Sequence, residues 1–215
     1  MPYEPKKFDA LIGTPGFSDT LLKNHFTLYE GYVKNVNGLG ESLQKLAPGT
    51  PEYGELKRRF GWEWNGMRLH ELYFGNMSKV PTSLEGLKIP SASEGPRTTP
   101  LESEIPSAAE GKKTIAGALD KFWGNTDGWL KDFKATGTMR GIGWTILYHD
   151  LEQARLFNAW VNEHDMGHLT GCTPLLVLDV FEHAYIGDYG LKRADYIDAF
   201  IKAIDWKTVS SRLNF

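Results

Sequence analysis

The chain has 215 residues, of which 41% are hydrophobic and 24% are charged, and its formal net charge is −3 at pH 7. This length and this composition predict a soluble globular protein of one or two domains with a core of its own. The negative net charge argues against a nucleic-acid partner, because nucleic-acid-binding proteins usually carry a basic face.

Features of the sequence also indicate a cytoplasmic protein. The single cysteine, Cys172, excludes a disulfide within the chain and fits a reducing compartment. The N-terminus, Met-Pro-Tyr-Glu-Pro-Lys-Lys, lacks the apolar core of a signal peptide. No stretch approaches the roughly 20 apolar residues that span a membrane, so no membrane partner is expected.

The first predicted element is a long helix over residues 20–37, preceded by a turn in which Ser18 is a good N-cap. His25 lies on one broad face of this helix. A histidine on such a face is most often a core residue with satisfied ring nitrogens. The apolar side chains of the same face recur at three- and four-residue steps: Leu21, Leu28, Tyr29, Tyr32, Val33 and Val36.

A second helix is predicted over residues 52–77, after the break Pro-Gly-Thr-Pro. Met67, Phe74 and Met77 form an apolar stripe on it, and His70 lies within that stripe. By itself His70 also has the pattern of a core histidine. The two helices are expected to pack as an antiparallel hairpin.

A compositional change divides the chain in two. Residues 78–111 are rich in Pro, Ser, Gly and Glu, and such a composition cannot bury much surface. A structureless stretch of this length is unusual inside a compact unit. We therefore predict an N-terminal helical hairpin domain over residues 1–80, an extended linker over 81–111 and a C-terminal α/β domain over 112–215.

The C-terminal part is predicted to contain both helices and strands. Two short helices, separated by Gly-Asn-Thr-Asp-Gly, are expected within residues 115–134. A strand over residues 144–148 and its partner over 155–162 follow, with His149 at the turn, exposed and without a function. One amphipathic helix over 194–207 closes the chain. The predicted fold class is α+β with a small antiparallel sheet.

The stretch Leu-Leu-Val-Leu-Asp-Val-Phe-Glu-His-Ala-Tyr, residues 175–185, carries the most chemical information. Its apolar run predicts a strand buried on both faces. Asp179 would be costly to bury unless it is paired or binds a metal. If a helix follows, the Asp179 carboxylate and the His183 imidazole can converge, which suits iron, manganese or zinc. The alternative is a helix-capping Asp179 and a core His183, and the segment alone favours this alternative slightly.

Residues 179–185 resemble the C-terminal signature of the iron/manganese superoxide dismutases. That signature is Asp-x-Trp-Glu-His-Ala-Tyr, and the chain matches it with Phe181 in place of the tryptophan. The resemblance implies conversion of superoxide to dioxygen and hydrogen peroxide, with one iron or manganese ion per subunit. The two metals use the same ligands, so the sequence does not choose between them. The similarity extends to further segments: 141–144 (Gly-x-Gly-Trp), 188–189, 192–196 and 204–206.

The resemblance implies that the metal ligands are His25, His70, Asp179 and His183 and that the metal site lies between the two domains. Residues 69–74, Leu-His-Glu-Leu-Tyr-Phe, match the spacing of the family's second-ligand motif Asn-His-x-x-Phe-Trp. They depart from it by Leu for Asn and by Tyr-Phe for Phe-Trp.

Another departure concerns the active-site tyrosine. Residues 32–37 match the family pattern Tyr-Val-x-Asn-x-Asn, but Tyr32 follows His25 by seven residues where the family has eight. On a regular helix, at about 100° per residue, seven steps bring a side chain almost back over its start. Our hypothesis is that the family helix carries one bulged residue that this chain lacks, so that Tyr32 faces the metal. Otherwise Asn24 lies in the ligand column, and Tyr29 remains the other candidate tyrosine.

The family also implies a polar group beside the metal. Most members carry a glutamine there, in a loop or four residues before the second ligand. The latter position is Gly66 in this chain, and His164 falls in the loop where some archaeal members carry a histidine. We therefore expect His164 to hydrogen-bond the metal-bound solvent, because such bonds tune its pKa and the redox potential. Glu163 and His168 are the alternatives, and His168 is better suited to satisfying loop backbone.

The remaining roles follow from the same resemblance. Tyr32 and His164 would order the solvent and help to relay protons. Arg193 matches an arginine at the mouth of the family's substrate funnel, where it would steer the anion; by composition alone, an ordinary surface arginine is as good an interpretation. Glu182 would reach a ligand histidine of a partner subunit and Tyr185 would lie at the same interface. A homodimer is thus implied, with a tetramer as the alternative.

Other functions stay open. A non-haem iron enzyme that uses dioxygen needs only two histidines and one carboxylate, so a fourth ligand argues against it. Zinc has no redox chemistry, so the resemblance favours iron or manganese. A catalytically silent metal-binding homologue would keep the ligands and lose the groups around them. The missing glutamine and the shifted tyrosine keep this last interpretation open.

Overall fold

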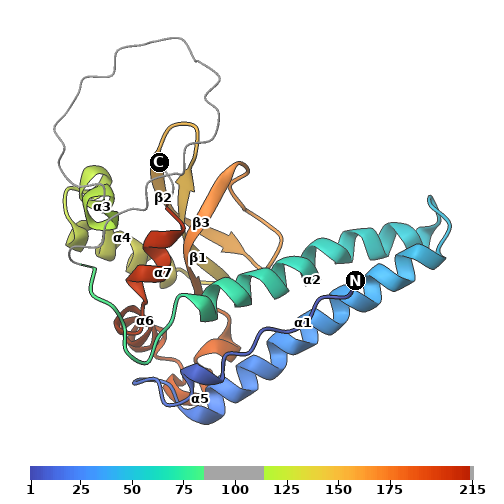
Figure 1. The fold of residues 1–215 in the computed structure, drawn as a ribbon, viewed down its shortest axis with the longest axis horizontal. Helices are drawn as coiled ribbons and strands as arrows, with labels where there is room; N and C mark the ends of the chain where they lie inside the picture. Colours follow the sequence, from blue (N-terminus) through green and yellow to red (C-terminus); the bar gives the residue numbers. More distant parts are fainter. Residues whose placement is uncertain (85–113, 214–215) are drawn as a thin grey trace, which may run out of the picture.

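The computed structural model describes residues 1–84 and 114–213. Its long helices α1 (Asp19–Lys45) and α2 (Pro51–Gly75) pack side by side as an antiparallel hairpin (Figure 1). One end of this hairpin lies against the rest of the molecule, and the other end projects away from it. The predicted hairpin is therefore confirmed.

Local signals explain where the two helices begin and end. Ser18 caps α1 as predicted, since its Oγ accepts a hydrogen bond from the amide of Leu21 at 3.1 Å. Thr50 caps α2 in the same way. Helix α1 continues beyond the predicted end at residue 37, because the first strong helix breaker after it is Pro48.

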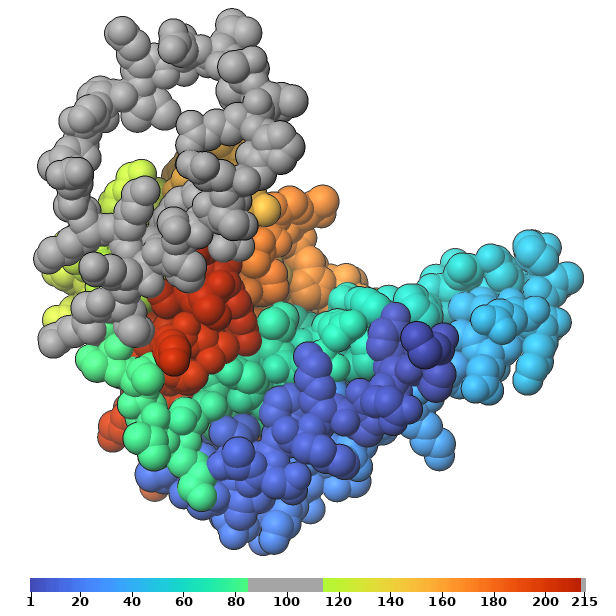
Figure 2. All heavy atoms as spheres, viewed as in Figure 1, coloured from blue at the N-terminus to red at the C-terminus, as the bar shows by residue number. Residues whose placement is uncertain are grey.

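The N-terminal arm, residues 1–8, lies along the hairpin (Figure 2). Tyr3 packs edge-on against Trp64 with 5.2 Å between the ring centroids. Lys6 Nζ forms an ion pair with Glu71 Oε2 at 2.8 Å. These contacts attach the arm to α2.

Two short helices follow the undescribed residues, as predicted. They are α3 (Ile115–Trp123) and α4 (Thr126–Gly137). Gly124 ends α3 with a φ of 82°, and Asn125 caps α4 by accepting a hydrogen bond from the amide of Gly128 at 2.7 Å. Both helices contact β2 of the sheet, and α4 also contacts β1.

The described residues contain one antiparallel sheet of three strands, in the order β2-β1-β3. The strands are β1 (Gly143–Asp150), β2 (Arg155–Asn162) and β3 (Cys172–Asp179). The apolar run of β3 is fully buried, as its sequence predicts. After β3 come the short helices η2 (Glu182–Ala184) and α5 (Ile186–Tyr189).

The expectation for His149 was wrong. Strand β1 does not stop at residue 148 but continues to Asp150, so His149 pairs with Leu156 on β2 and with Thr173 on β3. The side chain is buried, with 1% of the residue exposed. The turn predicted at His149 therefore lies further along the chain.

The single helix predicted over residues 194–207 was also wrong. The chain forms two helices there, α6 (Arg193–Lys202) and α7 (Trp206–Ser211). The interruption has a local cause: the Asp205 carboxylate accepts a hydrogen bond from the amide of Lys207 at 3.3 Å and so starts a new helix.

The predicted fold class is confirmed: an α+β chain in which a helical hairpin precedes an α/β part with a small antiparallel sheet. The predicted linker over residues 81–111 lies outside the described residues from residue 85 onward. The boundaries of the predicted domains 1–80 and 112–215 therefore stay a prediction. None of the described helices is long and apolar enough to cross a membrane.

Candidate metal centre

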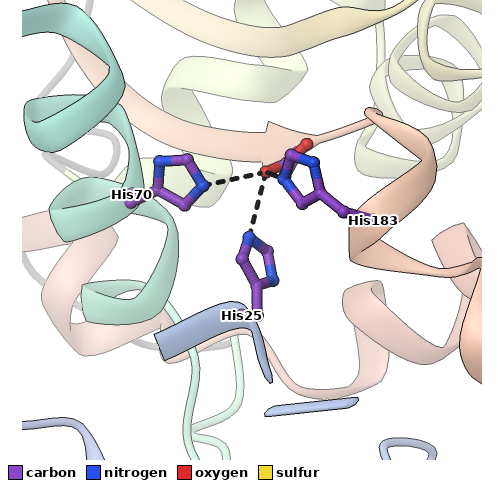
Figure 3. A group of neighbouring side chains, drawn as sticks. His25, His70 and His183 are labelled. Atoms are coloured by element: carbon purple, nitrogen blue, oxygen red, sulfur yellow. Dashed lines mark hydrogen bonds and ion pairs between the residues drawn. The ribbon is translucent and has the colours of Figure 1, made fainter. Parts of the chain in front are cut away.

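Within the described residues, side chains from separate elements converge where the hairpin meets the sheet (Figure 3). His25 comes from α1, His70 from α2, Asp179 from the end of β3 and His183 from η2. The Nε2 atoms of the three histidines lie close to Asp179 Oδ2, at 3.2 Å for His25, 3.6 Å for His70 and 3.1 Å for His183. All four ligand atoms lie within 4.8 Å of one another. Atoms that bind one ion at about 2 Å are about 3–4 Å apart, so this spacing suits a single metal ion.

Hydrogen bonds orient these side chains toward the centre. The Nδ1 atom of His70 lies 2.6 Å from the carbonyl oxygen of Gly66, which can only accept, so Nδ1 carries the proton. The other ring nitrogen, Nε2, is buried and has no hydrogen-bond partner in the described part of the chain. Asp179 Oδ1 accepts from the amide of Phe181 at 2.8 Å, which leaves Oδ2 facing the histidines. An unpaired buried imidazole nitrogen is the group that a bound cation would satisfy.

Burial and the contacts within the cluster decide the charge states of His25, His70 and Asp179. Burial lowers the pKa of His25, and it lowers the pKa of His70 well below the usual value, so both rings are neutral at pH 7. Burial alone would raise the pKa of Asp179, but the interactions of its carboxylate with the His183 and His25 imidazoles outweigh burial, and the net pKa is well below the ordinary value. Neutral imidazoles and an ionised carboxylate are the forms that bind metal ions.

Next to this cluster, Tyr32, His164 and Trp144 form a hydrogen-bonded chain. The indole of Trp144 donates to His164 Nδ1 at 3.1 Å, and His164 Nε2 lies 2.7 Å from the Tyr32 hydroxyl. Burial lowers the pKa of His164 to about 4, so the ring is neutral at pH 7. Because Nδ1 accepts, the single ring proton is on Nε2 and is donated to the Tyr32 oxygen. The Tyr32 hydroxyl proton then remains available to a second acceptor.

The structure places Tyr32, and not Tyr29, beside the cluster. Helix α1 is α-helical at every residue, His25 faces the cluster and Asn24 is exposed, in line with the hypothesis of a regular helix. The Tyr32 ring stacks on His70 with 5.2 Å between the centroids. In contrast, the Tyr29 hydroxyl donates to Glu71 at 3.1 Å, away from the cluster.

His164 is also the residue of its loop that lies beside the cluster, with 6.1 Å between its ring centroid and that of His70. His168 Nε2 lies 2.8 Å from the carbonyl oxygen of His164, so His168 satisfies loop backbone as expected. Its Nδ1 lies 2.9 Å from the Tyr148 hydroxyl. Glu163 adopts a φ of 54° in the turn.

Aromatic side chains surround His164, and one of them, Trp62, is not among the site residues predicted from the sequence. The Trp62 and Phe181 rings both lie 4.7 Å from the His164 ring, centroid to centroid. Trp62 lies two turns before His70 on α2, on the same side of the helix as Gly66. The four-residue steps from Trp62 to Gly66 to His70 were the pattern in the sequence that could have identified Trp62 as a neighbour of the site.

Arg193 is held by acceptors on neighbouring segments. Its guanidinium donates to the carbonyl oxygens of Met139 and Gly141 at 2.7 and 2.8 Å and to the Tyr185 hydroxyl at 3.2 Å. These bonds join the start of α6 to the loop before β1. Glu182 is exposed on η2.

Comparison with known proteins agrees with this geometry. A family model for the C-terminal domain of iron/manganese superoxide dismutases matches residues 111–212. The chain is 34% identical to an iron superoxide dismutase of Aquifex pyrophilus, over 97% of this chain and 90% of that protein. The chain belongs to the iron/manganese superoxide dismutase family.

The similarity to other superoxide dismutases also covers both parts of the chain. Identity to an iron superoxide dismutase of Sulfolobus acidocaldarius is 30%, over 99% of this chain and 92% of the relative. Identity to a manganese superoxide dismutase of Haloferax volcanii is 32% over the same shares. The family membership and the cluster together indicate one iron or manganese ion, and relatives named for either metal are similarly close.

Proposed function

We propose that this protein is an active superoxide dismutase in which His25, His70, Asp179 and His183 hold one iron or manganese ion. The observation that carries the proposal is the convergence of the imidazole Nε2 atoms on one buried carboxylate oxygen, at 3.1 to 3.6 Å. When bound, the metal supplies the one-electron redox chemistry by which two superoxide anions and two protons become dioxygen and hydrogen peroxide.

The chain's own contribution is to hold and deliver protons. His164 donates from Nε2 to the Tyr32 oxygen, and this leaves the Tyr32 hydroxyl proton directed to a small anion or water at the centre. Burial raises the Tyr32 pKa well above its usual value, so the hydroxyl keeps its proton at neutral pH. Trp144 fixes the His164 tautomer by donating to Nδ1. We infer that the hydrogen-bonded set of Tyr32, His164 and Trp144 takes the place of the glutamine found in most other members.

The proposal assigns Arg193 to substrate attraction. Its guanidinium carries a positive charge and is held in one place by three acceptors. A fixed positive charge raises the local concentration of a small anion even on a chain whose net charge is −3.

We further propose that the protein is a cytoplasmic homodimer, with a tetramer as the alternative. Glu182 is exposed on η2, next to His183. This position suits Glu182 for contact with a second subunit. Tyr185, which receives the hydrogen bond of Arg193, would lie at the same interface. A single cysteine in the chain fits a reducing compartment. Sedimentation of the parent and of a Glu182→Ala variant tests the assembly: the variant is expected to shift toward monomer.

The decisive experiment is superoxide dismutation by protein loaded separately with iron and with manganese, with the metal content of each sample measured. Activity with either metal supports the proposal and identifies the working metal. Full loading with both metals and no activity would instead establish a catalytically silent homologue. The absence of a glutamine at Gly66 is the observation that favours this second candidate.

A further inference from the structure

Side chains, rather than a neighbouring strand, bind the outer edge of β3. Among the strands that the structure describes, β3 has a neighbour on one side only. On its other side, the backbone of alternate residues is bound by side chains: Leu175 O by Arg212 at 2.7 Å, and Asp179 O by Tyr196 at 2.7 Å. Between them, Val177 is bound by Asn76. A strand edge that would otherwise be unsatisfied is thus paired at alternate residues from Leu175 to Asp179.

Asn76 makes the central contact of this edge. Its Nδ2 donates to Val177 O at 2.8 Å and to Tyr73 O at 2.9 Å, while its Oδ1 accepts from Val177 N at 3.2 Å and from Arg212 Nη1 at 2.8 Å. Both amide protons and both lone pairs are therefore used. The residue is fully buried, at 0% exposure, and it is the C-cap of α2, the helix that carries His70.

Arg212 completes the contact from the last turn of the described chain. It bonds Asn76 and Leu175 O through Nη1, and its Nη2 donates to Leu72 O at 3.3 Å. Leu72 O is one of the terminal carbonyls of α2, where a cation is favoured. Burial lowers the pKa of Arg212 to about 10, so the guanidinium remains charged at neutral pH. Gly75 leaves room for it, since a Cβ there would lie 3.3 Å from Nη2.

We propose that Asn76 and Arg212 are positioning residues of the metal centre, because together they lock the end of α2 against the edge of β3. His70 lies on α2 and Asp179 ends β3, so this contact sets how His70 Nε2 is placed relative to Asp179 Oδ2. The inference rests on the proposed function, in which both side chains are ligands. A helix packed on a sheet through apolar side chains alone can slide by fractions of an ångström, whereas directional hydrogen bonds resist that movement. Metal ligation tolerates deviations of only about 0.2 Å.

The test uses full-length protein carrying Arg212→Gln, Arg212→Lys or Asn76→Ser. Lys207→Gln is the matched control, since it also removes a positive charge from this end of the chain, but at an exposed position on α7. Each variant is loaded with iron or manganese. The readouts are the rate of metal loss to a chelator, the electron paramagnetic resonance spectrum of the ferric form, and the thermal midpoint.

Arg212→Gln and Asn76→Ser are expected to release metal at least about tenfold faster than the parent and to change the ferric spectrum. Arg212→Lys, which keeps the charge but loses the planar fork, is expected to lie between them and the parent. Lys207→Gln is expected to match the parent.

Folded variants that keep the parent's release rate and spectrum would overturn the inference, even if their thermal midpoints fell, because the contact would then serve stability alone. If the two more drastic variants do not fold, Arg212→Lys decides by the same readouts. A parent that takes up neither metal would overturn the proposed function and this inference with it. A parent that is loaded and active while its variants are unaffected would overturn only the inference.

Discussion

The ring of Tyr32 occupies the space in which a side chain on Gly66 would begin. A Cβ built on Gly66 would lie 2.5 Å from Tyr32 Cδ1 and 2.6 Å from Cε1, far inside van der Waals contact. In this protein the Tyr32 ring thus fills the space beside α2 through which a side chain at position 66 would have to extend toward the metal centre. The side chain that forms a hydrogen bond with Tyr32 comes instead from a loop, and it is that of His164.

Gly66→Ala should therefore displace Tyr32 and break its 2.7 Å contact with His164. We expect dismutation to fall about tenfold or more while the metal content stays at the parent level. Gly61→Ala is the matched control: the same substitution on the same helix, at a position where a Cβ would meet nothing within 4 Å. That control should keep full activity and gain up to about 1 kcal/mol of helix stability. Parent-level activity of Gly66→Ala would show that the packing of Tyr32 does not matter for catalysis.

Substitutions of the two tyrosines of α1 should have different effects on dismutation in the same assay. Tyr32→Phe removes the hydroxyl bonded to His164 and is expected to lower dismutation about 10- to 100-fold. Tyr29→Phe removes a hydroxyl that bonds Glu71 and the amide of Lys6, so activity should stay unchanged with some loss of thermal stability. The opposite pattern would assign the catalytic role to Tyr29.

His164→Ala should lower the dismutation rate roughly 100-fold or more in the metal-loaded protein, since it removes the donor to Tyr32 and the acceptor of Trp144. His164→Gln should recover part of this loss, because an amide can accept from the Trp144 indole and donate to Tyr32 at the same time. If His164→Ala were as active as the parent, the role assigned to His164 would be wrong.

The metal-free protein should lose stability in mild acid. Burial lowers the pKa of His164 from 6.5 to about 4 in the folded state, and the pKa values of His25 and His70 are lowered as well. Below pH 6.5 the unfolded chain therefore binds protons that the folded chain does not, so the free energy of unfolding falls as the pH falls from 6.5 toward 4. His164 alone contributes on the order of 3 kcal/mol to this loss.

Urea titrations of the metal-free protein at pH 7, 6, 5 and 4 measure this dependence. His164→Gln should make it shallower, because one of the buried rings no longer titrates. A free energy of unfolding that does not change between pH 7 and 4 would show that these histidines are not buried in the metal-free state.

Local patterns in the sequence determined much of this protein. The turn before α1 with its Ser18 cap, the apolar stripe that carries His70 and the uninterrupted aliphatic run of β3 each depend on neighbouring residues, and the structure has all of them. The motif that begins at Asp179 and contains His183 likewise named residues that lie together in the structure. Short-range periodicity and capping suffice for such features, because they are set within a few turns of chain.

Only the tertiary structure decided the rest. His149 is buried because β1 runs on between β2 and β3, and nothing beside it in the sequence shows this. The contact between Asn76 and Arg212 joins residues 136 positions apart, and the one between Tyr32 and His164 joins residues 132 apart. Periodicity carries no information over such separations. Which buried polar groups satisfy one another is determined only when the helices and the sheet pack together, since each must then find a partner within hydrogen-bonding distance.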